Sequence, residues 1–183
     1  MGNPREGGRW MLVLSACLAA FGGCSLKGSG LPPLQTVGHV DLQRYMGTWY
    51  EIARYPHRFQ DGCVGSRADY ELRPDGTVKV VNQCREGSPD GPVRKATGTA
   101  RVVDAATNAR LEVSFFRPFW GDYWIIELDP DYRWVMVGHP SRDYLWFLSR
   151  TPEMEEAVYQ RLVSGLPAKG YDPGRLLRTS GSR

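Results

Sequence analysis

From residue 47 onward, apolar and polar side chains alternate in short segments of strand length. The segment VGSRADYEL (64–72) places Ala68 and Tyr70 on one face and Asp69 and Glu71 on the other. A period of two is typical of strands whose two faces meet different surroundings. The segments with this pattern are 47–56, 64–72, 77–84, 94–103, 109–116, 122–128, 133–139 and 143–149. Their hairpin-length links predict an all-β fold, either a sandwich or an up-and-down barrel.

A helical pattern follows the last of these segments. Thr151 is a candidate N-cap, and Pro152 suits the first helical position. Apolar residues recur at four-residue spacing at Met154, Val158 and Leu162. The helix is expected to end at Gly165 and Pro167, after which PGRLLRT (173–179) is a candidate for a short ninth strand.

The composition is that of one globular domain. Of the 183 residues, 42% are hydrophobic and 23% are charged, which is too apolar for a disordered chain. The net charge of +3 is small, and the basic residues are scattered among acidic ones. The sequence therefore gives no indication of nucleic-acid binding.

The first thirty residues have the organisation of an export signal. Arg5 and Arg9 precede an uncharged run over 10–23, which is shorter than the roughly 20 residues that span a bilayer. Small residues before Cys24 resemble the lipobox of bacterial lipoproteins, in which the cysteine carries lipid. The motif LSAC at Cys17 is an alternative box, but it leaves almost no apolar segment after Arg9. An ordinary cleaved leader with an incidental cysteine is the other interpretation.

These features predict four segments. They are a lipoprotein signal peptide over 1–23, a flexible tether over 24–37, a barrel domain over 38–178 and a disordered tail over 179–183. Ser25 follows the candidate lipidation site, and in lipoproteins an aspartate at this position retains the protein at the inner membrane. The expected location is therefore the outer membrane, facing the periplasm.

Three motifs resemble the signatures of the lipocalin family. GTWYEIARYPHRF (47–59) is similar to the first, ELDPDYRWVMV (127–137) stands in the place of the second, and DYLWFLSRTP (143–152) carries the third. The likeness covers about residues 38–178 and is strongest to the bacterial outer-membrane lipocalins, apolipoprotein D and the plant temperature-induced lipocalins. Of the second signature only Asp131 and Tyr132 remain. The resemblance implies an eight-stranded antiparallel up-and-down barrel with one C-terminal helix.

The resemblance also implies roles for Gly47, Trp49 and Arg150 as structural signature residues. In lipocalins the tryptophan closes the narrow end of the barrel and the arginine lies across its indole. A guanidinium over an indole face gains about 0.5–2 kcal/mol, and its remaining donors can bind carbonyl groups at strand ends. These residues are expected to hold the fold without touching the ligand.

Cys63 and Cys84 lie near the far ends of the hairpin that turns at RPDG (73–76). Counting outward from the turn places them nearly opposite each other, within the spacing of a disulfide. The periplasm permits such a bond, which would fix the hairpin at the barrel mouth. The alternative is a free nucleophilic thiol, as in one enzymatic branch of the lipocalins.

No metal or cofactor site is expected. His39, His57 and His139 lack the spacing of metal ligands, and there is no acidic calcium-binding loop. Neither a GxSxG motif nor a phosphate-binding glycine loop is present.

An eight-stranded barrel leaves room for one small ligand, which inward-facing side chains would contact. The alternation predicts the inward set Ser66, Ala68, Tyr70, Val78, Val80, Asn82, Ala96, Gly98, Ala100, Leu111, Val113 and Phe115. Of these, Ser66, Ala68, Tyr70, Val80, Asn82, Ala100, Val113 and Phe115 are the expected ligand-binding residues. Small side chains leave space, and Tyr70 and Asn82 suit a polar head near the mouth. In the first strand, either Trp49, Glu51 and Ala53 or Tyr50, Ile52 and Arg54 could face inward.

The most aromatic stretch, FFRPFWGDYW (115–124), has two interpretations: a hairpin whose rings cover each other, or an apolar lip that contacts acyl chains, a membrane or a second subunit in a homodimer.

The combined prediction is a non-catalytic protein that binds, stores or transports fatty acids or lysophospholipids, the ligand class coming from the family resemblance. The rival hypotheses are an enzyme acting on a lipid or isoprenoid through Cys63 or Cys84, and a structural module with a filled barrel.

Overall fold

The computed structural model describes residues 31–179. Cys17, Cys24 and the expected signal peptide lie outside the described residues. The strands are β1 (Gly47–Arg54), β2 (Cys63–Leu72), β3 (Val78–Glu86), β4 (Val93–Val102), β5 (Arg110–Phe116), β6 (Phe119–Leu128), β7 (Trp134–Gly138), β8 (Leu145–Ser149) and β9 (Leu177–Arg178). The helices are α1 (Leu42–Tyr45), α2 (Glu156–Ser164) and the 3-10 turns η1 (Arg58–Gln60), η2 (Pro167–Lys169) and η3 (Pro173–Arg175).

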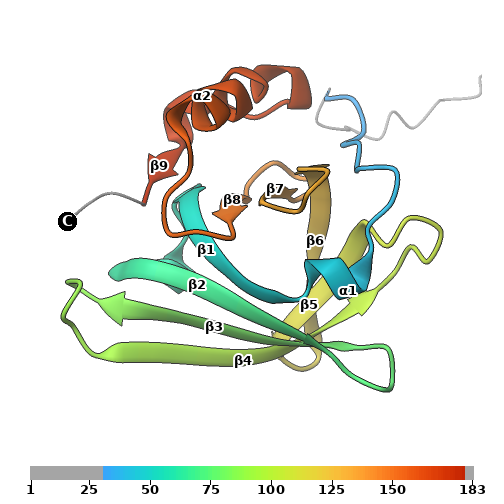
Figure 1. The fold of residues 1–183 in the computed structure, drawn as a ribbon, viewed down its shortest axis with the longest axis horizontal. Helices are drawn as coiled ribbons and strands as arrows, with labels where there is room; N and C mark the ends of the chain where they lie inside the picture. Colours follow the sequence, from blue (N-terminus) through green and yellow to red (C-terminus); the bar gives the residue numbers. More distant parts are fainter. Residues whose placement is uncertain (1–30, 180–183) are drawn as a thin grey trace, which may run out of the picture. The chain divides into compact units, whose positions relative to one another are not determined.

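Strands β1 to β8 form a closed antiparallel barrel of up-and-down topology (Figure 1). Each strand pairs with its sequence neighbour, and β1 closes the ring by pairing with both β2 and β8. Trp49 lies opposite Ala68 on β2, and Tyr50 lies opposite Ser149 on β8. The predicted barrel is therefore confirmed, and the sandwich alternative is wrong.

The ninth strand is present and very short. Strand β2 stays paired with β1 only as far as Tyr50, and β9 occupies the place beside β1 further along, with Ala53 opposite Arg178. The backbone N–H of Thr179 also donates to the carbonyl of Ile52 over 2.9 Å. Thr179, the first residue of the expected disordered tail, is thus bonded to the barrel.

Two apolar cores lie on the two sides of the barrel wall. One lines the barrel interior and includes Trp49, Val80, Leu111 and Val135. The other lies between the outer face and α2, where Tyr159 and Leu162 of the helix pack with residues such as Phe147. The amphipathic helix therefore covers one side of the barrel (Figure 1).

The predicted start of this helix is wrong. Thr151 does not cap it, because its hydroxyl donates to the carbonyl of Glu153 over 2.6 Å. The helix begins at Glu156, after Glu155, and Pro152 lies in the irregular segment before it. It ends, as predicted, at the glycine cap Gly165.

Residues 31–37, which we expected to belong to the tether, lie against the barrel. Leu34 is buried, and the backbone N–H of Val37 donates to the carbonyl of Ile125 over 3.0 Å. Arg142 holds this segment by donating to the carbonyl of Pro32 over 2.6 Å. Within residues 31–179, no helix has the length and apolar character needed to cross a membrane.

Candidate functional site: the barrel lumen

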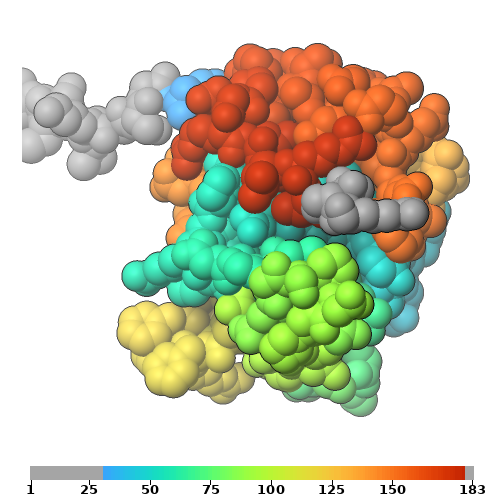
Figure 2. All heavy atoms as spheres, turned by 90° about the vertical axis from the view of Figure 1, so that its left-hand side faces the viewer, coloured from blue at the N-terminus to red at the C-terminus, as the bar shows by residue number. Residues whose placement is uncertain are grey.

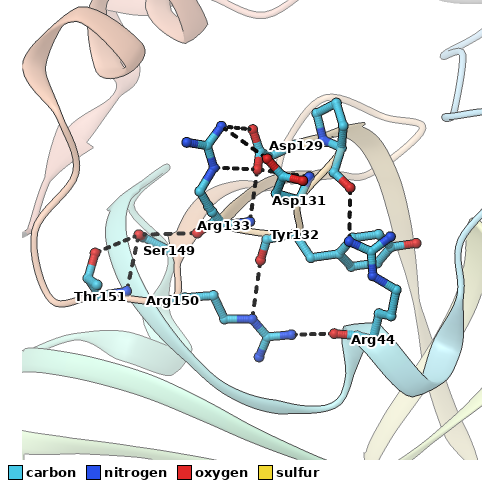
Figure 3. Close-up of polar contacts among 9 residues, drawn as sticks. Arg44, Asp129, Asp131, Tyr132, Arg133, Ser149, Arg150 and Thr151 are labelled. Carbon is cyan, nitrogen blue, oxygen red and sulfur yellow. Dashed lines mark hydrogen bonds and ion pairs between the residues drawn. The ribbon is translucent and has the colours of Figure 1, made fainter.

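The closed end of the barrel is built around Trp49 and Arg150. The guanidinium carbon of Arg150 lies 3.9 Å from the centroid of the Trp49 ring, and Trp49 is fully buried. Arg150 donates to the carbonyls of Arg44 (2.6 Å) and Tyr132 (3.3 Å), as Figure 3 shows. It also donates to the carbonyl of Thr48 (3.0 Å), so it ties β1, α1 and the β6–β7 turn together. Because the guanidinium of Arg150 is engaged by the Trp49 ring and by these carbonyls, Arg150 stabilises the fold.

Gly47 permits this arrangement in two ways. Its φ is +93°, a conformation that side chains rarely adopt, and an added Cβ would lie 3.3 Å from Nη1 of Arg150. The glycine of the first signature therefore leaves room for the arginine of the third.

The β6–β7 turn is held by Asp129. This buried carboxylate accepts bonds from the backbone of Asp131 and Arg133 and from the guanidinium of Arg133 (Figure 3). These bonds, the side-chain bonds of Arg133 first, lower the pKa of Asp129 despite its burial. Tyr132, which follows, accepts at its hydroxyl the backbone N–H of Asp41 over 2.8 Å and lies under Arg44. The remnant of the second signature thus meets the first and third at the closed end.

The strand registers define which residues face the lumen. Ala68 lies opposite Asn82, which lies opposite Ala96, so the three share one face. Tyr70, Val80 and Gly98 form the next such row, one step nearer the closed end. Ala68 and Val80 are buried, and Val80 belongs to the interior core, so this face is the inner one.

The inner face is buried at one end of the barrel and accessible at the other. Val78, Ala100 and Leu111 are buried, Val113 is half-buried, and Asn82, Ala96 and Phe115 are exposed. Inward-facing residues remain exposed only where a barrel is open, so the lumen opens among the β1–β2, β3–β4, β5–β6 and β7–β8 loops. Tyr70 and Asn82, expected together near the mouth, therefore lie at different depths.

Gly98 provides space within this face for an aromatic ring. A Cβ at this position would lie 2.7 Å from the carbonyl of Ser114 and 2.8 Å from Cδ1 of Phe115. The ring of Phe115 thus packs over the glycine, inside the wall near the mouth.

Strand β1 follows neither of the two expected alternations. Trp49 and Glu51 face inward, opposite Ala68 and Leu148. A bulge at Ile52 then shifts the register, so Ile52 joins the outer core while Arg54 faces inward, opposite Trp146.

The bulge brings two charged side chains together inside the wall. Glu51 and Arg54 are both buried, and Nε of Arg54 lies 3.2 Å from Oε1 of Glu51. Gln60 of η1 donates to Glu51 over 2.6 Å and to Ser66 over 3.2 Å, and it accepts from Trp146 over 3.0 Å. Burial raises the pKa of Glu51, while Gln60 and Arg54 act against this rise. The hydroxyl of Ser66, an expected ligand-binding residue, therefore already accepts a hydrogen bond from Gln60.

Three tyrosine hydroxyls meet deeper in the lumen. The hydroxyl oxygen of Tyr123 lies 2.7 Å from that of Tyr45 and 3.1 Å from that of Tyr70. The Tyr45 ring also lies 5.2 Å from the Trp49 ring, and Trp49 Nε1 donates to the carbonyl of Tyr45. We call Tyr45, Tyr70 and Tyr123 the tyrosine layer. It forms the floor that a ligand would meet, with Trp49 beneath it.

The mouth carries a disulfide between Cys63 and Cys84, as expected, with Cα atoms 5.5 Å apart. It joins the start of β2 to β3 near the β3–β4 loop. Neither sulfur is a free thiol, which removes the nucleophile that the enzymatic hypothesis required.

The β5–β6 hairpin projects at the mouth, where it forms the yellow lobe in Figure 2. The rings of Phe116 and Phe119 stack with centroids 6.3 Å apart, yet the two residues are 74% and 70% exposed. The stacking agrees with the interpretation in which the rings cover each other, whereas a contact of the exposed rings with acyl chains, a membrane or a second subunit stays a prediction.

A family model described as a lipocalin-like domain matches residues 40–181 of this chain. The chain belongs to the lipocalin family. It is 41% identical over 174 residues to the outer membrane lipoprotein Blc of Escherichia coli K12, covering 92% of this chain and 96% of that protein. It is 41% identical over 155 residues to temperature-induced lipocalin-1 of Arabidopsis thaliana, covering 80% and 82% of the two chains.

More distant proteins are also similar to this chain. Mouse apolipoprotein D is 31% identical over 158 residues, with 81% of this lipocalin and 79% of apolipoprotein D covered. Among solved structures, insecticyanin from the tobacco hornworm Manduca sexta superimposes with a TM-score of 0.66 at 18% identity, covering 84% and 87% of the two chains. That likeness concerns the fold alone.

Within residues 31–179 of this lipocalin, no group of three or more histidine, cysteine or acidic residues is placed to hold a metal ion. His57 packs against Trp146 with ring centroids 5.3 Å apart, and burial lowers its pKa. His139 lies 3.6 Å from Asp122 and contacts Ser141.

Sequence reasoning missed the Glu51–Arg54 pair and the tyrosine layer. The signal for the pair was two opposite charges three residues apart in an otherwise apolar strand. The tyrosine layer had no local signal, because Tyr45, Tyr70 and Tyr123 come from α1, β2 and β6.

Proposed function

We propose that this lipocalin is a non-catalytic carrier or store of a single elongated apolar molecule, a fatty acid or a lysophospholipid, held in the barrel lumen. The observation that supports it most directly is the gradient along the inner face, with buried Val80 and Ala100 deep inside and accessible Asn82 and Ala96 near the opening. Each methylene transferred from water into such a lumen contributes about 0.8 kcal/mol. An acyl chain is therefore retained without chemistry.

We further propose that the protein serves the outer membrane, anchored by a lipid on Cys24 and facing the periplasm. The likeness to outer membrane lipoprotein Blc and the lipobox-like sequence at Cys24 support this location. Mass spectrometry of the mature N-terminus tests it. Lipid on Cys24, lost in Cys24→Ser and kept in Cys17→Ser, is the expected result, and an unmodified cysteine would contradict it.

Native mass spectrometry tests the ligand class. Delipidated protein is mixed separately with palmitic acid and with palmitoyl lysophosphatidylethanolamine, and one bound molecule per chain is expected. A fluorescent fatty acid that both lipids displace gives the matching solution measurement. Uptake of neither lipid would rule out the carrier function and favour a filled, structural barrel.

A further inference from the structure

The tyrosine layer crosses the barrel. Tyr70 is on β2 and Tyr123 is on β6, and these strands are separated by three others in either direction around the ring of eight. They therefore lie on opposite sides, yet their hydroxyl oxygens are 3.1 Å apart. Tyr45 approaches from α1, and its ring stacks on that of Tyr70 at an interplanar angle of 13°. The hydroxyls thus meet near the barrel axis.

The layer holds more donors than its internal hydrogen bonds use. Three phenol groups carry three O–H donors, and only two hydrogen bonds join them. Whichever way these bonds run, one O–H is left without an acceptor among the groups of residues 31–179. Burial raises the pKa of Tyr45, Tyr70 and Tyr123 well above the ordinary value, so all three remain protonated donors at neutral pH.

A positive charge lies below this layer. Arg150 is stacked on Trp49 and bonded only to backbone carbonyls, with no carboxylate partner within the part of the chain that the structure describes. Its charge acts on Tyr45 and Tyr70 in the sense that favours negative charge there. The floor therefore offers one hydrogen-bond donor that no acceptor of residues 31–179 uses, close to the positive charge of Arg150.

The mouth differs from the floor in exposing several aromatic rings. Its exposed side chains include the aromatic residues Phe59, Phe115, Phe116 and Phe119. Glu51 and Arg54, the buried charges of the wall, are already paired with each other. Of the two polar groups expected to receive a head group, only Asn82 lies at the mouth, whose loops also expose Arg58 and Arg117. Arg58 lies over the ring of Phe59, and an apolar tail end would find several exposed rings there.

We propose that a bound fatty acid enters carboxyl first, with its carboxylate on the hydroxyls of the tyrosine layer and its tail end against the aromatic mouth. This inference rests on the proposed function and specifies the ligand as a single-chain carboxylic acid. A lysophospholipid, whose large head group cannot pass into the floor, can enter only by its methyl end and leaves the surplus O–H without a partner.

Orientation can be measured directly. Palmitic acid is labelled with 13C at the carboxyl carbon or at the terminal methyl, bound to the delipidated protein, and exposed to a water-soluble paramagnetic relaxation agent. The methyl signal is expected to relax several-fold faster than the carboxyl signal. The reverse result, a carboxyl end open to the agent, would overturn the proposal. This measurement needs no variant, so it stands even if a substitution destabilises the fold.

The triple variant Tyr45→Phe/Tyr70→Phe/Tyr123→Phe, which removes every hydroxyl of the tyrosine layer, gives an independent test. It is expected to weaken palmitic acid about tenfold, since hydrogen bonds to a charged group are stronger than neutral ones. Palmitoyl lysophosphatidylethanolamine should keep its affinity within about twofold, because it makes no such bond. The matched control is Tyr50→Phe, which removes a phenol hydroxyl from the outer face of β1. Equal effects on both lipids would contradict the proposal, whereas binding of neither lipid by the wild type would instead contradict the proposed function.

Discussion

The guanidinium of Arg150 lies against the indole of Trp49 and bonds to three backbone carbonyls from separate elements. Arg150→Lys keeps the charge but cannot reproduce three directed bonds from a planar group. We expect it to lower the free energy of unfolding by about 1–3 kcal/mol, measured by urea denaturation. Arg175→Lys is the control, since it alters an arginine that stacks on a different ring, that of Tyr55. Equal stability of Arg150→Lys and wild type would show that the charge alone suffices.

Asp129 should give the protein an acid-sensitive closed end. Its pKa is lowered in the folded state, so the folded state binds this proton less readily than the unfolded chain. The stabilisation is complete above the unfolded pKa of about 4 and is lost as the pH falls through the lower, folded value. Asp129→Asn should therefore cost about 1–3 kcal/mol at neutral pH and less as the pH approaches 3. Urea unfolding at a series of pH values measures this difference, and a constant difference would contradict it.

The disulfide between Cys63 and Cys84 is expected to stabilise the mouth. The two residues are 21 positions apart, and a loop of that size predicts about 3 kcal/mol through restriction of the unfolded chain. The double variant Cys63→Ser/Cys84→Ser should lose that amount in urea unfolding. Added reductant should destabilise the wild type and leave the double variant unchanged. A reactive thiol at either position in the native, oxidised protein would revive the enzymatic hypothesis.

The exposed rings of the β5–β6 hairpin should affect binding more than stability. Phe116→Ser/Phe119→Ser removes two rings that are mostly in water, so the free energy of unfolding should change by less than about 1 kcal/mol. Affinity for palmitic acid should fall several-fold if the rings cover the ligand. Sedimentation of the same variant tests the homodimer predicted from the sequence, because loss of a dimer would place the hairpin at that interface. Unchanged affinity and unchanged oligomeric state would leave the hairpin without either role.

The strands were predictable because apolar and polar side chains alternate within each of them. The family signatures added barrel closure, which depends on pairing between β1 and β8 that no local pattern specifies. The prediction that Thr151 caps the helix was wrong, because a threonine hydroxyl can also form a hydrogen bond within a turn. The bulge at Ile52 was not predictable from the sequence either. A single inserted residue changes the face on which every later side chain of β1 lies.

The site was predictable only in part. Alternation assigned Tyr70 and Asn82 to the same face, but depth depends on register, which separated them by one row. The meeting of Tyr70 with Tyr123 across the barrel depends on the curvature of the whole sheet. Contacts of this kind arise from tertiary structure. The sequence therefore predicts which residues line the barrel wall, but not which side chains meet across the lumen.

The seam between β1 and β8 also governs how the chain reaches its native state. Hairpins from β2 to β6 join near neighbours in sequence and can form while the chain is still being made. One edge of the first strand can pair early with β2, but its other edge must wait for β8, about a hundred residues later, and its pairs with β9 come later still. A chain that has not yet formed β8 keeps an unpaired edge on β1, and unpaired strand edges are prone to aggregation.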